Sequence, residues 1–140
     1  MKKPISPRLL TRGLLAREGG VHAETIRFYE KKSLLAEPAR TTAGYRHYPA
    51  DTVQRVRFIK RSQELGFTLA EISELLKLRA KPRGRSGAVK RLASEKLRVI
   101  DEKITDLQRM RGALGRLTAE CDGVGPISHC PILTAMEEQP

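Results

Sequence analysis

Two cysteines near the C-terminal end of the chain have the residue type and spacing of a soft-metal site. Cys121 and Cys130 have eight residues between them in the segment CDGVGPISHCP, whose two glycines and Pro126 favour a tight loop. Two thiolates held in one small loop bind soft metal ions well. His129, next to Cys130, is a candidate for an extra nitrogen ligand. A disulfide or two inert thiols are the alternatives.

The residues after the second cysteine predict a chemical environment for its thiol. Pro131 suits the first position of a short helix that runs to about Met136, so Cys130 becomes the expected N-cap. The positive end of a helix lowers the pKa of a thiol and favours the thiolate. Metal binding requires the thiolate form, so this position at the helix N-terminus suits Cys130 as a ligand.

A long helix must position this loop. Residues 86–119 contain no proline and carry apolar side chains at alternating steps of four and three. The seam consists of Ala93, Leu97, Ile100, Ile104, Leu107 and Leu114, with Arg111 as its only break. This heptad pattern predicts that two helices bury a common face, and the simplest partner is a second copy of the same helix. The alternative is an intramolecular bundle helix.

Shorter elements precede the long helix. One helix is expected over 11–18, with Thr11 as its cap, and a second over 23–32. Gly19-Gly20 separates them, which is the spacing of a helix-turn-helix. Residues 35–49 are typical of a hairpin or wing with its turn near 42–44. Further helices are expected over 50–65 and from Thr68, which forms a capping box with Glu71. A basic linker, 79–85, follows.

The composition favours a nucleic-acid partner. The formal net charge of +11 and the pI of about 10.2 suit binding to DNA or another anionic surface. No apolar run approaches the ~20 residues of a membrane span, and no signal peptide is expected. The chain has no visible nucleotide loop or nucleophile–base set, so we expect no enzyme.

Several motifs resemble one protein family. They are Thr25-Ile26-Arg27-Phe28-Tyr29-Glu30, Leu34-Leu35, Gly44-Tyr45-Arg46-His47-Tyr48 and Leu65-Gly66-Phe67-Thr68. In order and spacing they resemble the winged-helix head of MerR-family transcription regulators. The resemblance implies a mostly α fold with a winged helix-turn-helix DNA-binding domain (9–78), an antiparallel dimerisation helix (86–119), and a metal-binding loop with a short helix (120–140).

The resemblance and the residue types together give a set of candidate DNA contacts. Arg27 lies on the helix expected to enter the major groove, where it can bind guanine or a phosphate. The full set is Thr25, Arg27, Tyr29, Tyr45, Arg46, His47, Lys60 and Arg61. Arg46 and His47 lie on the wing, while Lys60 and Arg61 are expected to contact phosphates. Arg27 as an ordinary surface residue and the tyrosines as core residues are the alternatives.

Ser86 bears on the identity of the metal. In metal-sensing relatives this position comes from the partner subunit and faces the cysteine loop, with Ser typical of the branch that senses Cu(I), Ag(I) or Au(I) and Cys typical of the divalent branch. Two thiolates with a monovalent ion leave one negative charge, which a helix N-terminus stabilises. The eight-residue gap departs from the copper branch and matches the mercury type. With His129 as an extra ligand, Zn(II) or Hg(II) is the alternative.

The sequence therefore predicts a homodimeric, cytoplasmic regulator that binds double-stranded promoter DNA and senses a soft metal ion, foremost Cu(I). The resemblance implies activation through distortion of the promoter, so that RNA polymerase can use elements spaced too far apart. The alternatives are a divalent-metal sensor of the same family and a DNA-binding architectural protein without a ligand.

Overall fold

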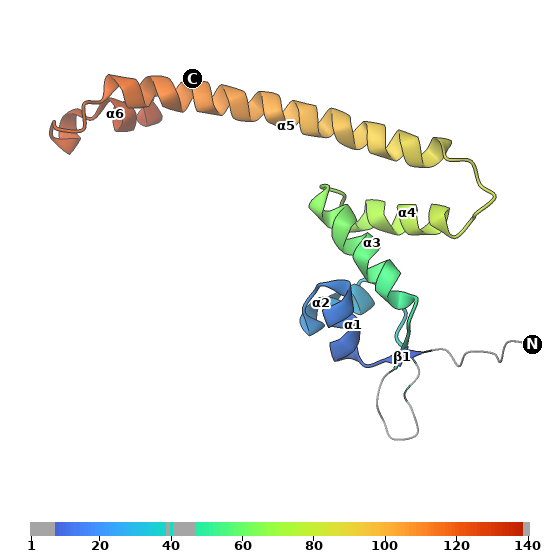
Figure 1. Cartoon of the computed structure of the whole chain (residues 1–140). Helices are drawn as coiled ribbons and strands as arrows, with labels where there is room; N and C mark the ends of the chain where they lie inside the picture. Colours follow the sequence, from blue (N-terminus) through green and yellow to red (C-terminus); the bar gives the residue numbers. More distant parts are fainter. Residues whose placement is uncertain (1–7, 39, 41–46, 139–140) are drawn as a thin grey trace, which may run out of the picture. The chain divides into compact units, whose positions relative to one another are not determined.

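A computed structural model describes residues 8–38, 40 and 47–138 of the chain, which forms two compact units, Met1–Leu92 and Ala93–Pro140. Helices make up most of both units, which confirms the predicted fold class (Figure 1). No helix of the described residues has the length and hydropathy needed to cross a membrane.

The first two helices form the predicted helix-turn-helix. Helix α1 (Arg12–Gly19) begins where the Thr11 hydroxyl accepts a hydrogen bond of 3.2 Å from the Leu14 N–H. It ends because Gly20 adopts a left-handed conformation with φ of 72°, which glycine reaches without steric cost. Helix α2 (Ala23–Lys31) follows after three residues. The predicted cap and glycine stop of the first helix are both confirmed.

A two-stranded antiparallel ribbon pairs the residues before α1 with residues that follow α2 in the chain. Strand β1 (Leu9–Leu10) pairs with β2 (Tyr48–Pro49), with Leu10 opposite Tyr48. Strand structure was predicted only within 35–49, so strand β1 at 9–10 was not predicted. The turn predicted at 42–44 lies outside the described residues, as do Tyr45 and Arg46.

Two further helices complete the first unit. Helix α3 (Thr52–Glu64) precedes α4 (Leu69–Arg79), and the predicted capping box at the start of α4 is present. The Thr68 hydroxyl accepts from the Glu71 N–H at 3.2 Å, and the Glu71 carboxylate accepts from the Thr68 N–H at 2.8 Å.

The core of this unit lies between α1, α2, α3, α4 and the ribbon. Its members are Leu10, Leu15, Ala16, Ile26, Tyr29, Leu34, Leu35, Tyr48, Val53, Val56, Ile59, Ile72 and Leu76. Gly19 lets α1 approach α3 closely, because a Cβ built on it would lie 2.5 Å from Cγ1 of Val56.

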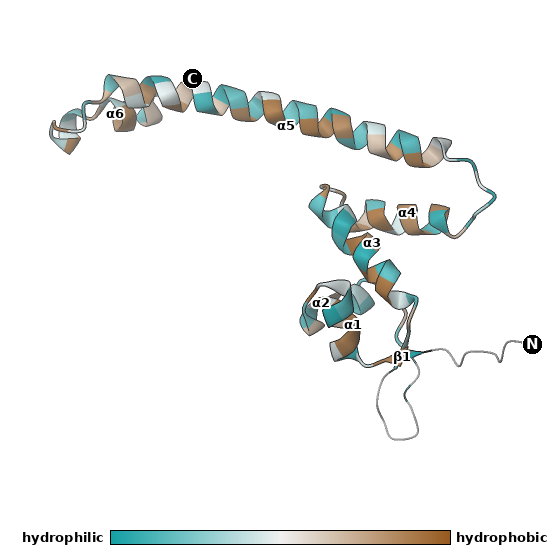
Figure 2. Ribbon diagram, viewed as in Figure 1, coloured by the Kyte–Doolittle hydropathy of each residue, from teal (hydrophilic) through white to brown (hydrophobic). Residues whose placement is uncertain are grey.

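The long helix α5 (Gly87–Glu120) begins in the first unit and forms most of the second, which also contains the 3₁₀ turn η1 (Ile127–His129) and helix α6 (Pro131–Glu137). None of the residues of α5 is buried. Apolar residues recur along it (Figure 2), and Leu97 and Leu107 of the predicted seam are each 60% exposed. The predicted limits of the helix differ from those observed by one residue at each end.

Candidate DNA-binding and metal sites

Helix α2 presents the leading candidate for a DNA contact. The Arg27 side chain is 58% exposed, and its Nη1 lies 2.8 Å from Oε1 of Glu24, one turn earlier on the same helix. Thr25 is half-buried beside it. An exposed guanidinium on this helix has the donors needed for guanine or a phosphate.

Tyr29 lies in the core, which is one of the two interpretations that the sequence left open. Its side chain is buried, and its hydroxyl donates a 2.7 Å hydrogen bond to Oε1 of Gln63 on α3. Burial first, and the nearby Glu64 charge second, raise the pKa of Tyr29. The hydroxyl therefore has a hydrogen-bond partner within the first unit, and the ring packs in the core.

The two predicted phosphate contacts on α3 differ from each other. Nζ of Lys60 donates a 2.7 Å hydrogen bond to the Gly20 carbonyl at the end of α1. Arg57, which the sequence analysis did not select, donates two hydrogen bonds of 3.1 and 2.9 Å to the Glu18 carbonyl. Both cations therefore satisfy the open C-terminus of α1. Arg61 is 70% exposed in a surface pair with Glu64 and remains accessible.

A buried polar cluster, which the sequence analysis missed, joins α1, α2 and β2. The Tyr48 hydroxyl donates a hydrogen bond to Oε1 of Glu30, and Nε of Arg12 lies 3.4 Å from that hydroxyl. Nη2 of Arg12 lies 3.5 Å from Oε2 of Glu30 and is buried without a hydrogen-bond partner within the described residues. Glu30 follows the buried Ile26 by four residues, so the helical period already placed it on the inner face of α2.

The cysteine loop is organised by its own backbone. Oδ1 of Asp122 accepts hydrogen bonds from the N–H groups of Val124 and Gly125 at 2.9 and 3.3 Å. These two bonds lower the pKa of Asp122. Gly123, which lies between Asp122 and Val124 in the chain, has φ of 76°, so glycine suits this turn. At the far end of the loop, the Cys130 N–H donates to the Ile127 carbonyl at 3.1 Å and closes the 3₁₀ turn.

The two thiols of this loop lie together. Cys121 and Cys130 are both half-buried and free, and Cys130 is the N-cap residue of α6, as predicted. Its side chain makes no capping hydrogen bond of ordinary geometry, yet the Leu133 N–H faces its sulfur and lowers the pKa of Cys130. The Ile132 N–H and a hydrogen bond with Cys121 act in the same direction, against the effect of desolvation. The loop therefore favours thiolate at Cys130.

The other two predicted metal-site residues are His129, in the 3₁₀ turn η1, and Ser86, which is expected to reach the site from the partner subunit. Nδ1 of the exposed His129 lies 3.0 Å from Oγ of Ser128. No group of three or more His, Cys, Asp or Glu side chains that could hold a metal ion occurs among the described residues. Ser86 lies directly before α5 in the first unit, where its carbonyl accepts a 2.9 Å hydrogen bond from the Lys90 N–H.

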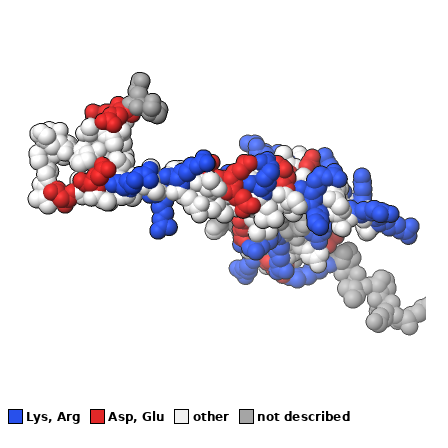
Figure 3. Space-filling view, turned by 90° about the horizontal axis from the view of Figure 1, so that it is seen from above, with Lys and Arg blue, Asp and Glu red and all other residues white. Residues whose placement is uncertain are grey.

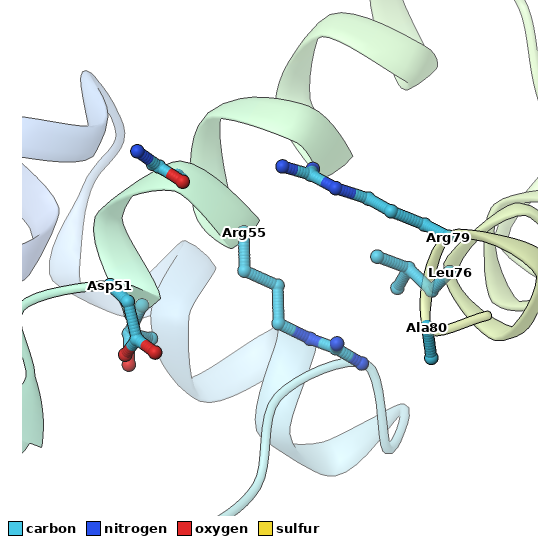
Figure 4. A pocket seen from close by; sticks show the side chains of 7 residues that line it. Asp51, Arg55, Leu76, Arg79 and Ala80 are labelled. Carbon is cyan, nitrogen blue, oxygen red and sulfur yellow. The ribbon is translucent and has the colours of Figure 1, made fainter. Parts of the chain in front are cut away.

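A polar pocket of about 320 Å³ lies between α3 and α4 and includes Asp51, Arg55 and Arg79 in its lining (Figure 4). Nε of Arg55 donates a 2.7 Å hydrogen bond to the Leu34 carbonyl, and the Arg79 guanidinium lies 4.9 Å from the centre of the Phe58 ring. Both arginines therefore take part in intramolecular contacts, and the lining contains none of the predicted site residues.

Basic side chains are concentrated before the cysteine loop. Lys and Arg side chains recur over the first unit and along α5, interrupted by Asp and Glu, and none follows Arg116 (Figure 3), in a chain that has 27 Lys and Arg against 16 Asp and Glu. Such an excess attracts polyanions and raises association rates with DNA.

Comparison with known proteins identifies the family. The model described as "MerR HTH family regulatory protein" matches residues 11–78, and that described as "MerR, DNA binding" matches residues 53–117. A mercuric resistance operon regulatory protein of Pseudomonas fluorescens is 40% identical over 128 residues, which cover 91% of this chain and 88% of the relative.

Two solved structures are also similar. The transcription regulator PbrR691 of Ralstonia metallidurans CH34, in complex with lead(II), has a TM-score of 0.81 at 32% identity and covers 91% of this chain and 98% of its own. The regulator MerR of Bacillus megaterium MB1, in complex with mercury(II), has a TM-score of 0.66 at 35% identity and covers 90% and 97%. These relatives are regulators rather than enzymes, and the chain belongs to the MerR family of DNA-binding transcription regulators.

Proposed function

We propose that this MerR-family protein is a metal-responsive regulator that binds promoter DNA as a homodimer and holds a soft metal ion between Cys121 and Cys130. The observation that carries the proposal is a pair of neighbouring thiols, Cys121 directly after α5 and Cys130 at the start of α6, the second with a lowered pKa. The names of the relatives add support, since they include a mercuric resistance regulator and regulators in complex with lead(II) and mercury(II).

The donor set fits an ion that accepts two sulfur ligands. Two thiolates without a third His, Cys, Asp or Glu nearby among the described residues suit Cu(I), Ag(I) or Au(I), whereas Zn(II) commonly takes four ligands. Ser86 in place of a third cysteine favours the same choice. When bound, the ion supplies a positive charge that links the two thiolates. Cys121 and Cys130 hold it, Asp122 fixes the loop, and the N–H groups of α6 stabilise the sulfur charge.

Hg(II) is the second candidate. It also binds two thiolates tightly, and two specific observations favour it: the 40% identity to a mercuric resistance regulator and the eight-residue gap between the cysteines. For a divalent ion, His129 is proposed as an additional ligand.

The DNA-binding part of the proposal rests on the first unit. Arg27 and Thr25 on α2 are proposed to enter the major groove, while His47 and Arg61, with Tyr45 and Arg46 of the wing, approach the backbone. The exposed seam of α5 is proposed to pair antiparallel with that of a second copy, with Ser86 of the partner subunit facing the loop. Bending the promoter costs roughly 1–6 kcal/mol. Metal-dependent contacts between protein and DNA are proposed to offset this cost, so that RNA polymerase can use the bent promoter. With promoter DNA as its partner, the protein is proposed to act in the cytoplasm.

A reporter assay with a panel of ions tests the proposal. Wild type, Cys121→Ser, Cys130→Ser and Ser86→Cys are compared under Cu(I), Ag(I), Zn(II) and Hg(II), with DNA binding measured in parallel. Each single cysteine variant should lose the metal response and keep DNA binding, because each removes half of a two-ligand site. Ser86→Cys should shift the response toward divalent ions. Full activation by both cysteine variants would refute the loop as sensor, and a wild type that responds best to Hg(II) would favour the second candidate.

A further inference from the structure

The buried cluster of Arg12, Glu30 and Tyr48 connects the parts of the head that are proposed to contact DNA. Its three side chains come from the start of α1, the last turn of α2 and strand β2. The Glu30 side chain is only 3% exposed and the Arg12 side chain 20%, so the Glu30 carboxylate is shielded from water and cannot itself reach a nucleic acid.

The ribbon depends on side chains for its position. Its strands have two residues each, with the pairs Leu9–Pro49 and Leu10–Tyr48, and so short a ribbon is marginal without packing. The hydrogen bond from the Tyr48 hydroxyl to the Glu30 carboxylate ties β2 directly to α2. Arg12, which follows β1 after one residue, approaches both groups from α1.

The same cluster is adjacent to a candidate DNA contact on each side. Glu30 follows Arg27 by one turn of α2, and Tyr48 directly follows His47. We propose that Glu30, through Tyr48 and Arg12, is a positioning residue for DNA binding: it fixes the ribbon, and with it His47, relative to Arg27 on α2. This inference rests on the proposed function, because it assumes that α2 and the ribbon bind the same DNA.

The geometry favours positioning over simple stabilisation. A buried ion pair is weak evidence for stability, because the desolvation penalty of the two charges can exceed their mutual attraction. Nη2 of Arg12 lies 3.5 Å from Oε2 of Glu30 and makes no hydrogen bond within the described part of the chain. An apolar residue would hold the core without that penalty, whereas the carboxylate fixes the direction of the Tyr48 hydroxyl.

The test compares Tyr48→Phe and Glu30→Gln with wild type. Tyr48→Phe removes the hydrogen bond at constant charge and nearly constant shape. Glu30→Gln keeps an acceptor but removes the charge, so Glu74→Gln, an exposed position on α4, serves as the matched control for net charge. DNA affinity is measured over a range of salt concentrations on a duplex that wild-type protein has selected from random sequences.

If the cluster positions the ribbon, both variants should lose phosphate contacts. Each phosphate contact that a cationic side chain such as Arg27 loses lowers the slope of log K against log[salt] by about 0.9, which corresponds to about a fivefold lower affinity at 0.15 M salt. Glu74→Gln should keep at least the wild-type slope. Circular dichroism and sedimentation establish that the variants stay folded and keep the oligomeric state of wild type.

The slope separates positioning from folding. A variant that only unfolds more easily lowers the active fraction and leaves the slope unchanged, which would overturn the inference, as would wild-type affinity and slope in both variants. If Glu30→Gln does not fold, Tyr48→Phe decides alone. If wild-type protein selects no DNA, the proposed function fails, and the inference fails with it.

Discussion

Replacing Gly19 with alanine should destabilise the head, although alanine is the better helix former. The added Cβ would lie 2.5 Å from Cγ1 and 3.2 Å from Cβ of Val56, a residue with no exposed surface. Val56 is β-branched and has few alternative rotamers, so α1 and α3 must separate. Overpacking of this kind costs about 1–3 kcal/mol.

Gly13→Ala is the matched control on the same helix. A Cβ at this position meets only Oγ1 of Thr11, at 4.0 Å, so the substitution should stabilise the protein by about 0.5–1 kcal/mol through helix propensity. The two glycine-to-alanine variants should thus differ by roughly 2 kcal/mol or more in the free energy of unfolding, from the same two effects.

Urea denaturation followed by circular dichroism, at one protein concentration, measures this difference. A double-mutant cycle with Val56→Ala locates the cause, because removing Cγ1 should relieve most of the destabilisation by Gly19→Ala. Equal stability of the two alanine variants would refute the close approach of α1 and α3. If Gly19→Ala destabilised the Val56→Ala background as much as wild type, Val56 would not be the source of the clash.

Three more predictions concern the dimer, the DNA contact and pH. The double variant Ile100→Asp, Leu107→Asp should be monomeric by sedimentation and should not bind DNA, because both residues lie on the predicted seam of α5, where no residue is buried. A double variant that stays dimeric would show that the seam is wrongly assigned. Arg27→Ala should weaken operator binding by about 1–3 kcal/mol at one base position if Arg27 reads a base, and evenly across sequences if it binds phosphate; unchanged affinity would remove it from the site. Burial raises the pKa of Tyr29 and Tyr48 above the usual value of 10.0, so the stability that they contribute is complete below about pH 10 and is lost as pH rises above it. Urea denaturation between pH 8 and 11 should show a smaller alkaline loss in Tyr48→Phe than in wild type.

Local signals predicted much of the fold. Helix caps depend on only a few neighbouring residues, and all three lie where the sequence predicted them. The capping hydrogen bonds are made by Thr11 and by Thr68 with Glu71, and Cys130 occupies the N-cap position of α6. The helical period likewise predicted α5 to within one residue at each end. These features depend on neighbours along the chain, so they can be read without knowledge of the tertiary fold.

Contacts between distant residues could not be predicted in the same way. Lys60 donates a hydrogen bond to a carbonyl 40 residues earlier in the chain, and no local pattern reveals that neighbour. Strand β1 has only two residues, too few for alternation to mark it. Tyr29 could be read either as core or as a DNA contact from its type alone, and only its burial and its bond to Gln63 separate the two.

The ribbon between Leu10 and Tyr48 also has a consequence for folding and amide exchange. This pairing closes a loop that contains both helices of the helix-turn-helix, so its formation depends on a contact of long sequence separation, which forms late and at an entropic cost. Opening the ribbon should therefore release one edge of α1 and α2 together. The amides at this edge should exchange with solvent as one cooperative unit, at a lower free energy than those of α3.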